Sequence, residues 1–458
     1  MKKKLLVTAI AVASAVVGTS AMAASTFGNP GQLGSLLVFP RIEAETQNFA
    51  PSVATGTGVL ATTTDTLVHL TNDGPNDVAV QCYWNTTSQI YTGKGGNTGT
   101  NTVLNTGTNP TTIDPATGVV TPASSLNSTP AERMAARAAL REQHAQGFEL
   151  VLKKGRTHSF WAGDLSGLAN GAYIALGNKL STIENVPQFN FFPDGSQSNV
   201  GDLKCFAKQN GKEAKFNFLT GKATVFTFND PLSVPGPGTG LPTAATLGQA
   251  HEYNAWSFQR LAAAGAPGEL KLDGKEYDIC PMALTGSYIP SAHPFASFGP
   301  GVPNVTQVSL SSCNQNLEEN GAANISLLKY TVVDSAGNKR SAGYECMGAW
   351  AEADLGDKFH AFTYGALKAD QASFRIQAGA RSRLCNVDQA AAFVNKTDLR
   401  PTPGAIEADV VESGLVGIQV TDVGGAWQTS SSLTGVDVTA ASASGYYNSK
   451  LQVNSFKY

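Results

Sequence analysis

Hydrophobic and polar residues alternate with a period of two in two runs within residues 66–84. The second run places Val78, Val80 and Cys82 on one face of an extended chain. This alternation, with β-branched and aromatic residues, is typical of strands that lay one face against a core. Residues 72–77 read Asn-Asp-Gly-Pro-Asn-Asp, and these residue types favour a turn. The pattern predicts a β-hairpin that carries Cys82 into a core.

A similar order of elements occurs in the second half of the chain. Residues 324–333 predict a strand, residues 334–339 a turn, and residues 343–350 a second strand that contains Cys346 and Trp350. This loose repetition predicts a mainly β fold with two Ig-like β-sandwich domains, each with an internal disulfide and short helical insertions.

Changes in composition along the chain divide it into segments. We predict a first β-sandwich domain over residues 24–230, a linker and helix over 231–268, and a second β-sandwich domain over 269–400. Residues 401–458 are rich in glycine, serine, threonine and alanine and predict a C-terminal segment with short strands.

Two stretches interrupt the strand pattern. Residues 93–128 are a Gly/Thr/Asn/Pro tract with few large hydrophobic side chains, which predicts a disordered surface insertion. Thr129 and Glu132 fit a capping box and Gly147 fits a helix end, so residues 129–147 predict a helix. An alanine-rich run predicts the second helix, from about residue 244 to 264.

The N-terminus predicts export. Residues 1–23 combine three lysines, an uncharged hydrophobic run and a small-x-small site before Ala24, the pattern of a cleaved signal peptide. The alternative is a membrane anchor, but an anchor needs about 20 hydrophobic residues. No later hydrophobic run is long enough to span a membrane, so we expect the mature chain to have no transmembrane segment.

Charge excludes one class of partner. Loss of residues 1–23 lowers the number of basic residues from 32 to 29, against 35 acidic ones. The mature chain is therefore mildly acidic and has no basic stripe for nucleic acid.

The chain contains an even number of cysteines, which in an exported protein favours disulfides. Six cysteines allow fifteen sets of three pairs. Order along the chain favours sequential pairing. No Cys-x-x-Cys motif or neighbouring histidine indicates zinc. The cysteines and the predicted pairs are Cys82 with Cys205, Cys280 with Cys313, and Cys346 with Cys385.

No motif indicates covalent catalysis. The chain lacks a Gly-x-Ser-x-Gly elbow and a His-Glu-x-x-His helix, and its six histidines are scattered singly. His158, close to Trp161 and Asp164 in sequence, is the least ordinary of them, although a lone histidine is more often structural. A glycosidase with two carboxylates from distant strands stays open, because spacing in sequence does not test that geometry. We predict no catalytic residues and no cofactor.

Two weak binding sites can be proposed from sequence. Asp194, Ser196, Ser198 and Asp202 are spaced somewhat like calcium ligands, but the segment lacks the acid density of an EF-hand and favours a plain turn. Trp161 and Trp256 could stack on a sugar, with His158 nearby. Tryptophans beside cysteines, such as Trp84, more often pack in a sandwich core.

Several motifs resemble those of a group of secreted bacterial proteins without an assigned activity. They are Gly-Ser-Leu-Leu-Val-Phe-Pro at 34–40, Val-Gln-Cys-Tyr-Trp at 80–84, Gly-Asp-Leu-Lys-Cys at 201–205, Phe-Leu-Thr-Gly-Lys-Ala-Thr at 218–224 and Ser-Leu-Ser-Ser-Cys-Asn-Gln-Asn-Leu at 309–317. The resemblance spans about residues 33–385 and implies export, with no site residue to carry over. The tract at 93–128 does not fit the pattern.

These observations predict a non-enzymatic structural or adhesive component of the bacterial envelope or cell surface. Its partners would be other envelope or surface proteins, or polysaccharide. The alternatives are a periplasmic or surface protein that binds carbohydrate or a small ligand, and, third, a secreted hydrolase. Exposed strand edges would favour assembly, and exposed tryptophans in a groove would favour carbohydrate binding.

Overall fold

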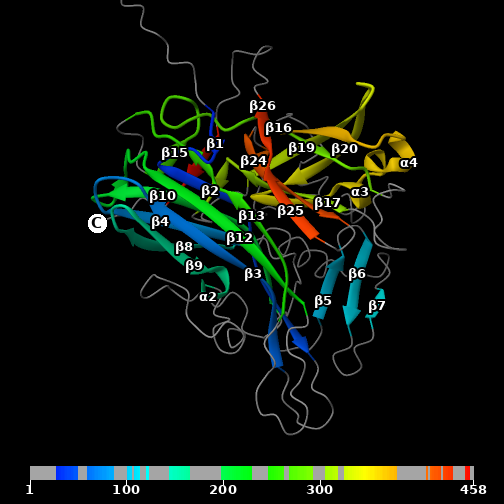
Figure 1. Ribbon diagram of the computed structural model, residues 1–458, viewed down its shortest axis with the longest axis horizontal. Coiled ribbons are helices and arrows are strands. Elements are labelled where there is room, and N and C mark those ends of the chain that lie inside the picture. Colours follow the sequence, from blue (N-terminus) through cyan, green and yellow to red (C-terminus); the bar gives the residue numbers. More distant parts are fainter. Residues whose placement is uncertain are drawn as a thin grey trace, which may run out of the picture.

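The computed structural model is predominantly β-strand, with only short helices among the residues it describes (Figure 1). Those residues are 27–49, 59–86, 101–105, 108–113, 120–122, 144–165, 197–229, 246–262, 268–291, 305–317, 324–378, 409–410, 413–423, 427–436 and 449–453. The mainly β fold predicted from the sequence is confirmed.

The first β region is a single sheet of eleven strands that bends into two layers. One layer contains the ladders β14-β2-β10-β4-β8, and the other contains β13-β12-β3-β9. The elements are β1 (Asn29–Pro30), β2 (Leu36–Phe49), β3 (Val59–Asn72), β4 (Val78–Thr86), β8 (His144–Leu152), β9 (Arg156–Trp161), α2 (Ala162–Leu165), β10 (Gln197–Gln209), β11 (Lys212–Glu213), β12 (Leu219–Asn229), β13 (Thr246–Asn254) and β14 (Trp256–Phe258).

The long strands β2 and β3 connect the two layers. Near its start β2 pairs with β14, and its later residues pair with β3. β3 in turn pairs first with β2 and then, from Leu67, with β9. Residues of both layers share one hydrophobic core, which includes Phe39, Val68, Trp84, Leu150, Phe160 and Val225. This arrangement is a β-sandwich formed from one bent sheet.

The second β region pairs a six-stranded sheet with a four-stranded sheet (Figure 1). The six-stranded sheet contains β16 (Ala283–Tyr288), β19 (Asn324–Asp334), β20 (Lys339–Met347), β22 (Ala372–Ala378), β23 (Asp409–Val410) and β26 (Thr434–Val436). The four-stranded sheet contains β17 (Val305–Ser312), β21 (Trp350–Asp354), β24 (Leu415–Val423) and β25 (Trp427–Ser432). Short helical turns follow β21, namely α3 (Leu355–Lys358), η3 (His360–Phe362) and α4 (Tyr364–Leu367).

A small third sheet fixes the C-terminal end of the described chain. It joins β15 (Glu269–Lys271), β27 (Lys450–Gln452) and β18 (Gln315–Asn316). Leu451 and Val453 are buried in the core of the second region. The part of residues 401–458 that the structure describes is therefore integrated into the second region and does not form a separate segment.

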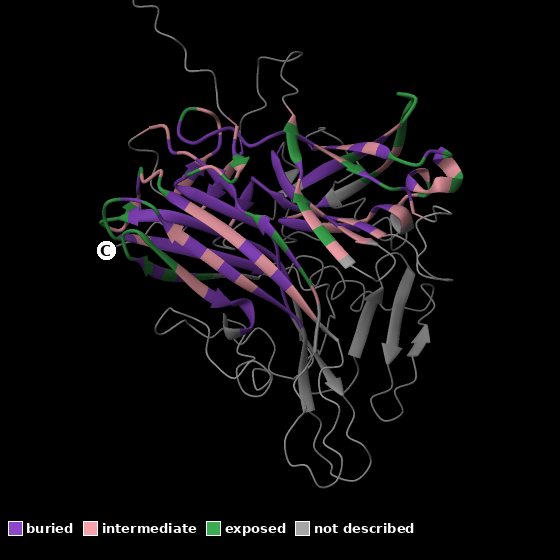
Figure 2. Cartoon of the chain, in the orientation of Figure 1, coloured by how far each residue is buried: buried purple, intermediate pink, exposed green. Residues whose placement is uncertain are grey.

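Burial explains why the opening motif at 34–40 is hydrophobic without alternation. Leu36 and Val38 face the core of the second region, whereas Leu37 and Phe39 face the core of the first. Both faces of this part of β2 are covered, as Figure 2 shows by the continuous burial of the strand. A strand buried on both faces reads as a hydrophobic run.

Two helix predictions are wrong where the structure describes them. Residues 144–147, the end of the helix predicted at 129–147, belong to β8, and Gly147 lies opposite Tyr83 of β4; residues 129–143 lie outside the described residues. The helix predicted within 231–268 is replaced by β13 and β14, which continue the first sheet. In β13, His251 and Tyr253 are buried while Glu252 and Asn254 are exposed, so pairing with β12 overrides the helix propensity of the alanines.

The disorder predicted for 93–128 is wrong in part. Three short strands, β5 (Asn101–Asn105), β6 (Thr108–Ile113) and β7 (Val120–Pro122), form an antiparallel sheet there. Threonine is β-branched and suits extended backbone even where large hydrophobic side chains are few. The rest of the tract lies outside the described residues.

The structure contains two of the three predicted disulfides, Cys82–Cys205 and Cys280–Cys313. Cys82 and Cys205 are register partners in the neighbouring strands β4 and β10, with Cα atoms 4.0 Å apart. This bond lies within one layer, whereas the conserved disulfide of antibody domains joins two sheets. The pairing of Cys346 with Cys385 lies outside the described residues, as does the signal peptide.

Candidate functional site

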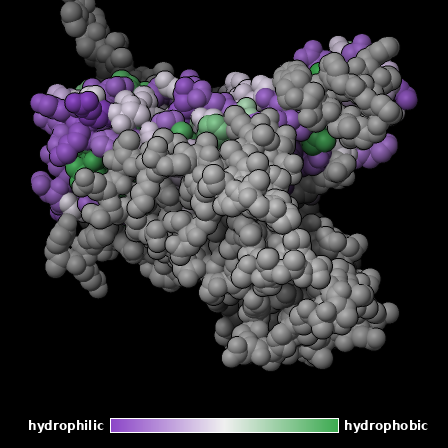
Figure 3. Space-filling model, turned by 60° about the horizontal axis from the view of Figure 1, so that its bottom comes forward, coloured by the Kyte–Doolittle hydropathy of each residue, from purple (hydrophilic) through white to green (hydrophobic). Residues whose placement is uncertain are grey.

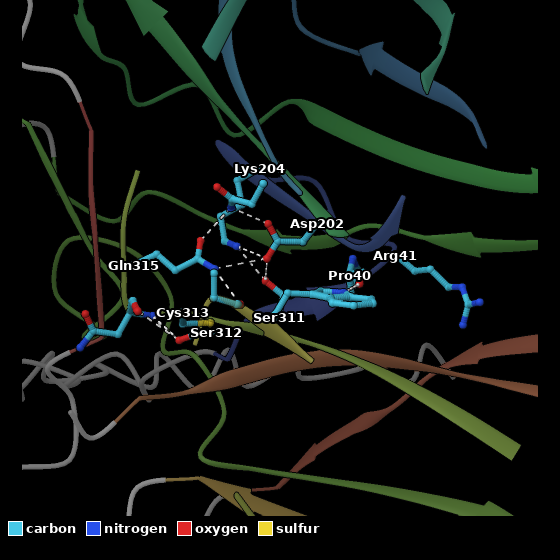
Figure 4. Close-up of polar contacts among 12 residues, drawn as sticks. Pro40, Arg41, Asp202, Lys204, Ser311, Ser312, Cys313 and Gln315 are labelled. Carbon is cyan, nitrogen blue, oxygen red and sulfur yellow. Dashed lines mark hydrogen bonds and ion pairs between the residues drawn. The ribbon is translucent and has the colours of Figure 1, made fainter. Parts of the chain in front are cut away.

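A bulge in β2 marks the place where the two β regions meet. Ile42 pairs with Gly201 and Phe39 with Leu203, so Pro40 and Arg41 together stand opposite the single residue Asp202. Proline has no N–H to donate, which makes a bulge a suitable position for it inside a sheet. The extra residue directs the Arg41 side chain away from Asp202, as Figure 4 shows.

Side chains from both regions satisfy the backbone that the bulge leaves free. The Trp350 Nε1–H donates to the carbonyl of Pro40 at 2.5 Å, from β21 of the second region. The Arg41 N–H donates to the Tyr253 hydroxyl at 3.1 Å, and that hydroxyl donates to the Arg41 carbonyl. The bulge is therefore part of the interface between the regions and stabilises it.

On one side of the bulge lies a buried polar centre, which we define as Asn85, Asp202, Lys204, Ser311 and Gln315 (Figure 4). Lys204 Nζ is 2.5 Å from Asp202 Oδ2 and donates to Ser311 Oγ at 2.8 Å. Ser311 Oγ also donates to Asp202 Oδ2. Asn85 Nδ2 donates to Asp202 Oδ1 at 2.6 Å.

Gln315 completes the polar centre from the second region. Its Nε2 donates to the Ala349 carbonyl at 2.7 Å and lies 3.4 Å from Asp202 Oδ2. Its Oε1 accepts from Asn85 Nδ2 at 3.0 Å. Asn85, Asp202 and Lys204 belong to the first region, whereas Ser311 and Gln315 belong to the second, so the hydrogen bonds cross the interface.

The polar centre is sealed from solvent. The side chains of Lys204 and Asp202 are 1% and 0% exposed. Burial lowers the pKa of Lys204, although the charge and hydrogen bond of Asp202 act in the opposite direction. A lysine and a carboxylate buried together lose several kcal/mol of hydration each, so their partners must be held closely in place.

The two disulfides hold the polar centre from both sides. Cys205 follows Lys204 directly and points into the first core, on the face of β10 opposite Lys204. Cys313 lies between Ser311 and Gln315 and is bonded to Cys280. The strands that supply the polar groups are therefore cross-linked next to those groups.

A second charged cluster lies on the other side of the bulge. Arg41 forms ion pairs with Glu43 and, at 2.8 Å, with Glu352 of β21. Arg41 Nη1 also lies 3.3 Å from Ser309 Oγ and from Gln307 Oε1, both on β17. This cluster again joins β2 to the four-stranded sheet.

His251 lies near this cluster and is uncharged at neutral pH. Burial, and after it the charge of Arg41, lower the pKa of His251 to about 4, although Gln428 favours the charged form. His251 is on β13 and Gln428 on β25, so this contact also crosses the interface.

Chemically, a serine beside a lysine of lowered pKa can act as a nucleophile and base. In this structure Ser311 is 0% exposed and its hydroxyl is hydrogen-bonded to Lys204 and Asp202. A substrate from solution has no access to a residue so completely covered.

The structure places the predicted sugar-binding residues apart from the polar centre. Trp161 is 3% exposed, and its ring centroid is 5.3 Å from that of Phe226. Trp256 is 1% exposed and donates from Nε1 to the Gly417 carbonyl at 3.0 Å.

His158, the third residue of this predicted site, is half-buried and accepts a hydrogen bond from the Lys153 N–H at 3.2 Å. Its pKa is lowered first by burial and then by the charges of Lys153 and Arg156. The two tryptophan rings pack in the interior, and ligand binding by these residues stays a prediction.

The calcium-like segment has a different structure from the turn that its sequence favours. Ser198 and Asp202 lie within strand β10, and Asp202 binds Lys204. Asp194 and Ser196 lie outside the described residues. Among the described residues, no group of three or more His, Cys, Asp and Glu side chains could hold a metal ion.

The polar centre was missed from sequence, although a signal for it existed. In residues 201–206, Leu203 and Cys205 share one face of the strand, and Asp202, Lys204 and Phe206 share the other. A face that combines an aromatic residue with two opposite charges indicates a buried ion pair beside a second core. The partners Ser311 and Gln315, more than 100 residues away in sequence, give no comparable signal.

Comparison of the chain with protein-family models, curated proteins and solved structures found no match. In the part of the chain that the structure describes, no helix has the length and hydrophobicity needed to cross a membrane.

Proposed function

We propose that this protein is an exported, non-enzymatic structural or adhesive component of the bacterial envelope or cell surface. The observation that supports this proposal is the interface itself. Its charged groups, Lys204, Asp202 and Arg41, are buried and bonded to partners across two β regions. Side chains committed in this way hold the regions together and are not available to a ligand in solution.

Strands that pair with a single described neighbour give this body a means of assembly. Among the described strands, β8 pairs only with β4, and β20 pairs only with β19. An edge strand presents unpaired N–H and C=O groups, to which another chain can add a strand. Side chains of Val151 on β8 and Tyr344 on β20 are 55% and 51% exposed. These edges are the surfaces that we assign to contacts with other envelope proteins.

The visible outer surface fits contact with water. Figure 3 shows hydrophilic residues gathered at the two ends of the visible described surface, with only small hydrophobic areas among and between them. The disulfides fit an oxidising compartment, since thiols are kept reduced in the cytosol.

Fractionation of cells that produce the protein, combined with a membrane-impermeant amine label, tests this proposal. We expect a mature chain that begins at Ala24, co-fractionates with the envelope and is labelled on intact cells. Exposed lysines such as Lys153, whose side chain is 61% exposed, provide the labelling sites. A full-length chain in the cytosolic fraction that is labelled only after lysis would contradict the proposal. A labelled cytosolic marker would show that the cells had leaked and that the experiment must be repeated with intact cells.

A further inference from the structure

The side chains of Lys204 and Gln315 converge on one carboxylate oxygen in a site sealed from water (Figure 4). We propose that Lys204 and Gln315 form an intramolecular amide bond that covalently joins β10 of the first region to β18 of the second. The inference depends on the geometry of the polar centre and is independent of where the protein resides.

Lys204 is the nucleophile. An amine attacks only when it is neutral, and an enzyme often obtains a neutral lysine by removing it from water. Burial acts in this direction on Lys204, whose side chain is 1% exposed. Asp202 Oδ2, 2.5 Å away, is placed to take a proton from Nζ, and the Ser311 hydroxyl holds Nζ from a second direction at 2.8 Å.

Gln315 is the electrophile. Negative charge develops on its Oε1 when the amine attacks the carbonyl carbon, and a donor already aimed at that oxygen stabilises the charge. Asn85 Nδ2 is that donor, at 3.0 Å from Oε1. The leaving nitrogen, Nε2, lies 3.4 Å from the same Asp202 Oδ2 that contacts Lys204 Nζ. Asp202 can therefore take a proton from the amine and give it to the leaving group.

The reaction balances without an added reagent. One bond forms between Lys204 Nζ and the side-chain carbonyl carbon of Gln315, and the bond from that carbon to Nε2 breaks. The hydrogen lost by Nζ passes through Asp202 to Nε2, which leaves as ammonia. No atom changes oxidation state, and Asp202 ends in the state in which it began.

The side chain of Asn85 is a second carboxamide near Lys204, but the contacts of the two carboxamides favour Gln315 as the target. Asn85 Nδ2 approaches Asp202 Oδ1, whereas Gln315 Nε2 and Lys204 Nζ share Oδ2. Asn85 moreover acts as the donor to the Gln315 carbonyl. The geometry thus gives Asn85 the positioning role and Gln315 the reacting one.

The mass of the reduced mature protein, residues 24–458, tests the proposal. We expect a mass below that of the sequence by one ammonia, about 17 Da. Trypsin should then leave Lys204 uncleaved and release a branched peptide in which Leu180–Lys208 is joined to Glu276–Lys329. Lys204→Arg and Gln315→Leu should both restore the full mass, while Lys208→Arg on the same strand should keep the deficit. Lys204→Arg keeps the positive charge that Lys204 carries before the bond forms, so it disturbs the buried site less than a neutral replacement would.

Two results would overturn the inference. A wild-type mass equal to the sequence mass, with unmodified peptides for both residues, would show that no bond forms. A deficit whose branched peptide contains Ile42–Lys94 would place the bond at Asn85 instead. The wild-type spectrum decides the matter by itself, so a variant that fails to fold does not remove the test.

Discussion

Two connections in this molecule follow the same sequence pattern and have different structures. Residues 72–77 and 334–338 both link two strands through a short stretch that is rich in Asn, Asp and Gly, and each second strand contains a cysteine. The second connection joins β19 and β20, which pair with each other as a hairpin. The first joins β3 and β4, which do not pair: β3 pairs with β12, β9 and β2, and β4 with β10 and β8. The hairpin predicted for residues 66–84 is therefore wrong, although both of its strands and its turn are present.

The hydrogen bonds of the two turns explain the difference. In the hairpin, Asp334 accepts from the N–H groups of Ala336 and Asn338 and from the Asn338 side chain, and Gly337 has φ of 85°. All these partners lie within four residues. The connection at 72–77 joins two strands that do not pair, and we call it the arch. In the arch, Asn72 donates to the carbonyl of Asn76 but also to that of Leu152 in β8. A turn that bonds only to itself closes a hairpin, whereas the arch is held by contacts with distant strands.

The largest effect should come from removing the Cys82–Cys205 disulfide, which links β4, the strand after the turn at 72–77, to β10. Cys82→Ala combined with Cys205→Ala removes a disulfide with a sequence separation of 123. Chain entropy predicts a loss of about 5 kcal/mol in the free energy of unfolding, measured by urea denaturation. The matched control, Cys280→Ala with Cys313→Ala, opens a separation of 33 and should cost about 1 kcal/mol less. A larger loss in the control would contradict the chain-entropy expectation that the disulfide closing the longer loop contributes more stability.

The next effect separates buried from exposed turn contacts. Asn72→Ala removes the bonds to Asn76, Leu152 and Gly74, and two of these three bonds are buried. We expect a loss of about 2–3 kcal/mol in the free energy of unfolding, because a buried carbonyl and N–H stay unpaired. Asn338→Ala in the exposed hairpin turn should cost no more than about 1 kcal/mol. Equal losses in thermal denaturation would show that the contacts of Asn72 with distant residues stabilise the arch no more than the contacts within the turn stabilise the hairpin.

The same contrast shows how far the sequence determines the fold. Runs of hydrophobic and β-branched residues located β3, β4, β19 and β20, although β4 is buried on both faces, and turn residues located both connections. The partner of each strand could not be read, because register and pairing depend on contacts such as Asn72 with Leu152 that are 80 residues apart. The disulfide pairs Cys82–Cys205 and Cys280–Cys313 were predicted from the order of the cysteines along the chain.

The candidate site was less predictable than the fold. From sequence, Asp202 belongs with Asp194, Ser196 and Ser198 to a weak calcium-like spacing that favours a plain turn, and nothing singles out Lys204. Their pairing with Ser311 and Gln315 depends on how the second region docks on β10. A period-two pattern indicates which face of a strand is buried. It does not predict which distant residues that face contacts where two cores meet.

The smallest effect concerns the charges of the two turns. Hydrogen bonds from the Asn338 side chain, and then from the N–H groups of Asn338 and Ala336, lower the pKa of Asp334. In the arch, the Lys154 N–H and then the Lys153 side chain lower the pKa of Asp77. Because the folded pKa is below the unfolded value of about 4, each ionised carboxylate stabilises the fold above that pH. The stabilisation is lost as the pH falls through the lowered folded value.

Asp334→Asn and Asp77→Asn test whether these two carboxylates depend on different surroundings. Each variant should unfold at a lower temperature than the wild type at pH 7, and the difference should shrink as the pH falls below about 4. The donors of Asp77 lie in the β8–β9 turn, 76 and 77 residues away, whereas those of Asp334 lie within four residues. Lys153→Ala should therefore reduce the effect of Asp77→Asn and leave that of Asp334→Asn unchanged. If Lys153→Ala altered both effects equally, the distinction between a turn held by distant strands and a turn held by itself would fail.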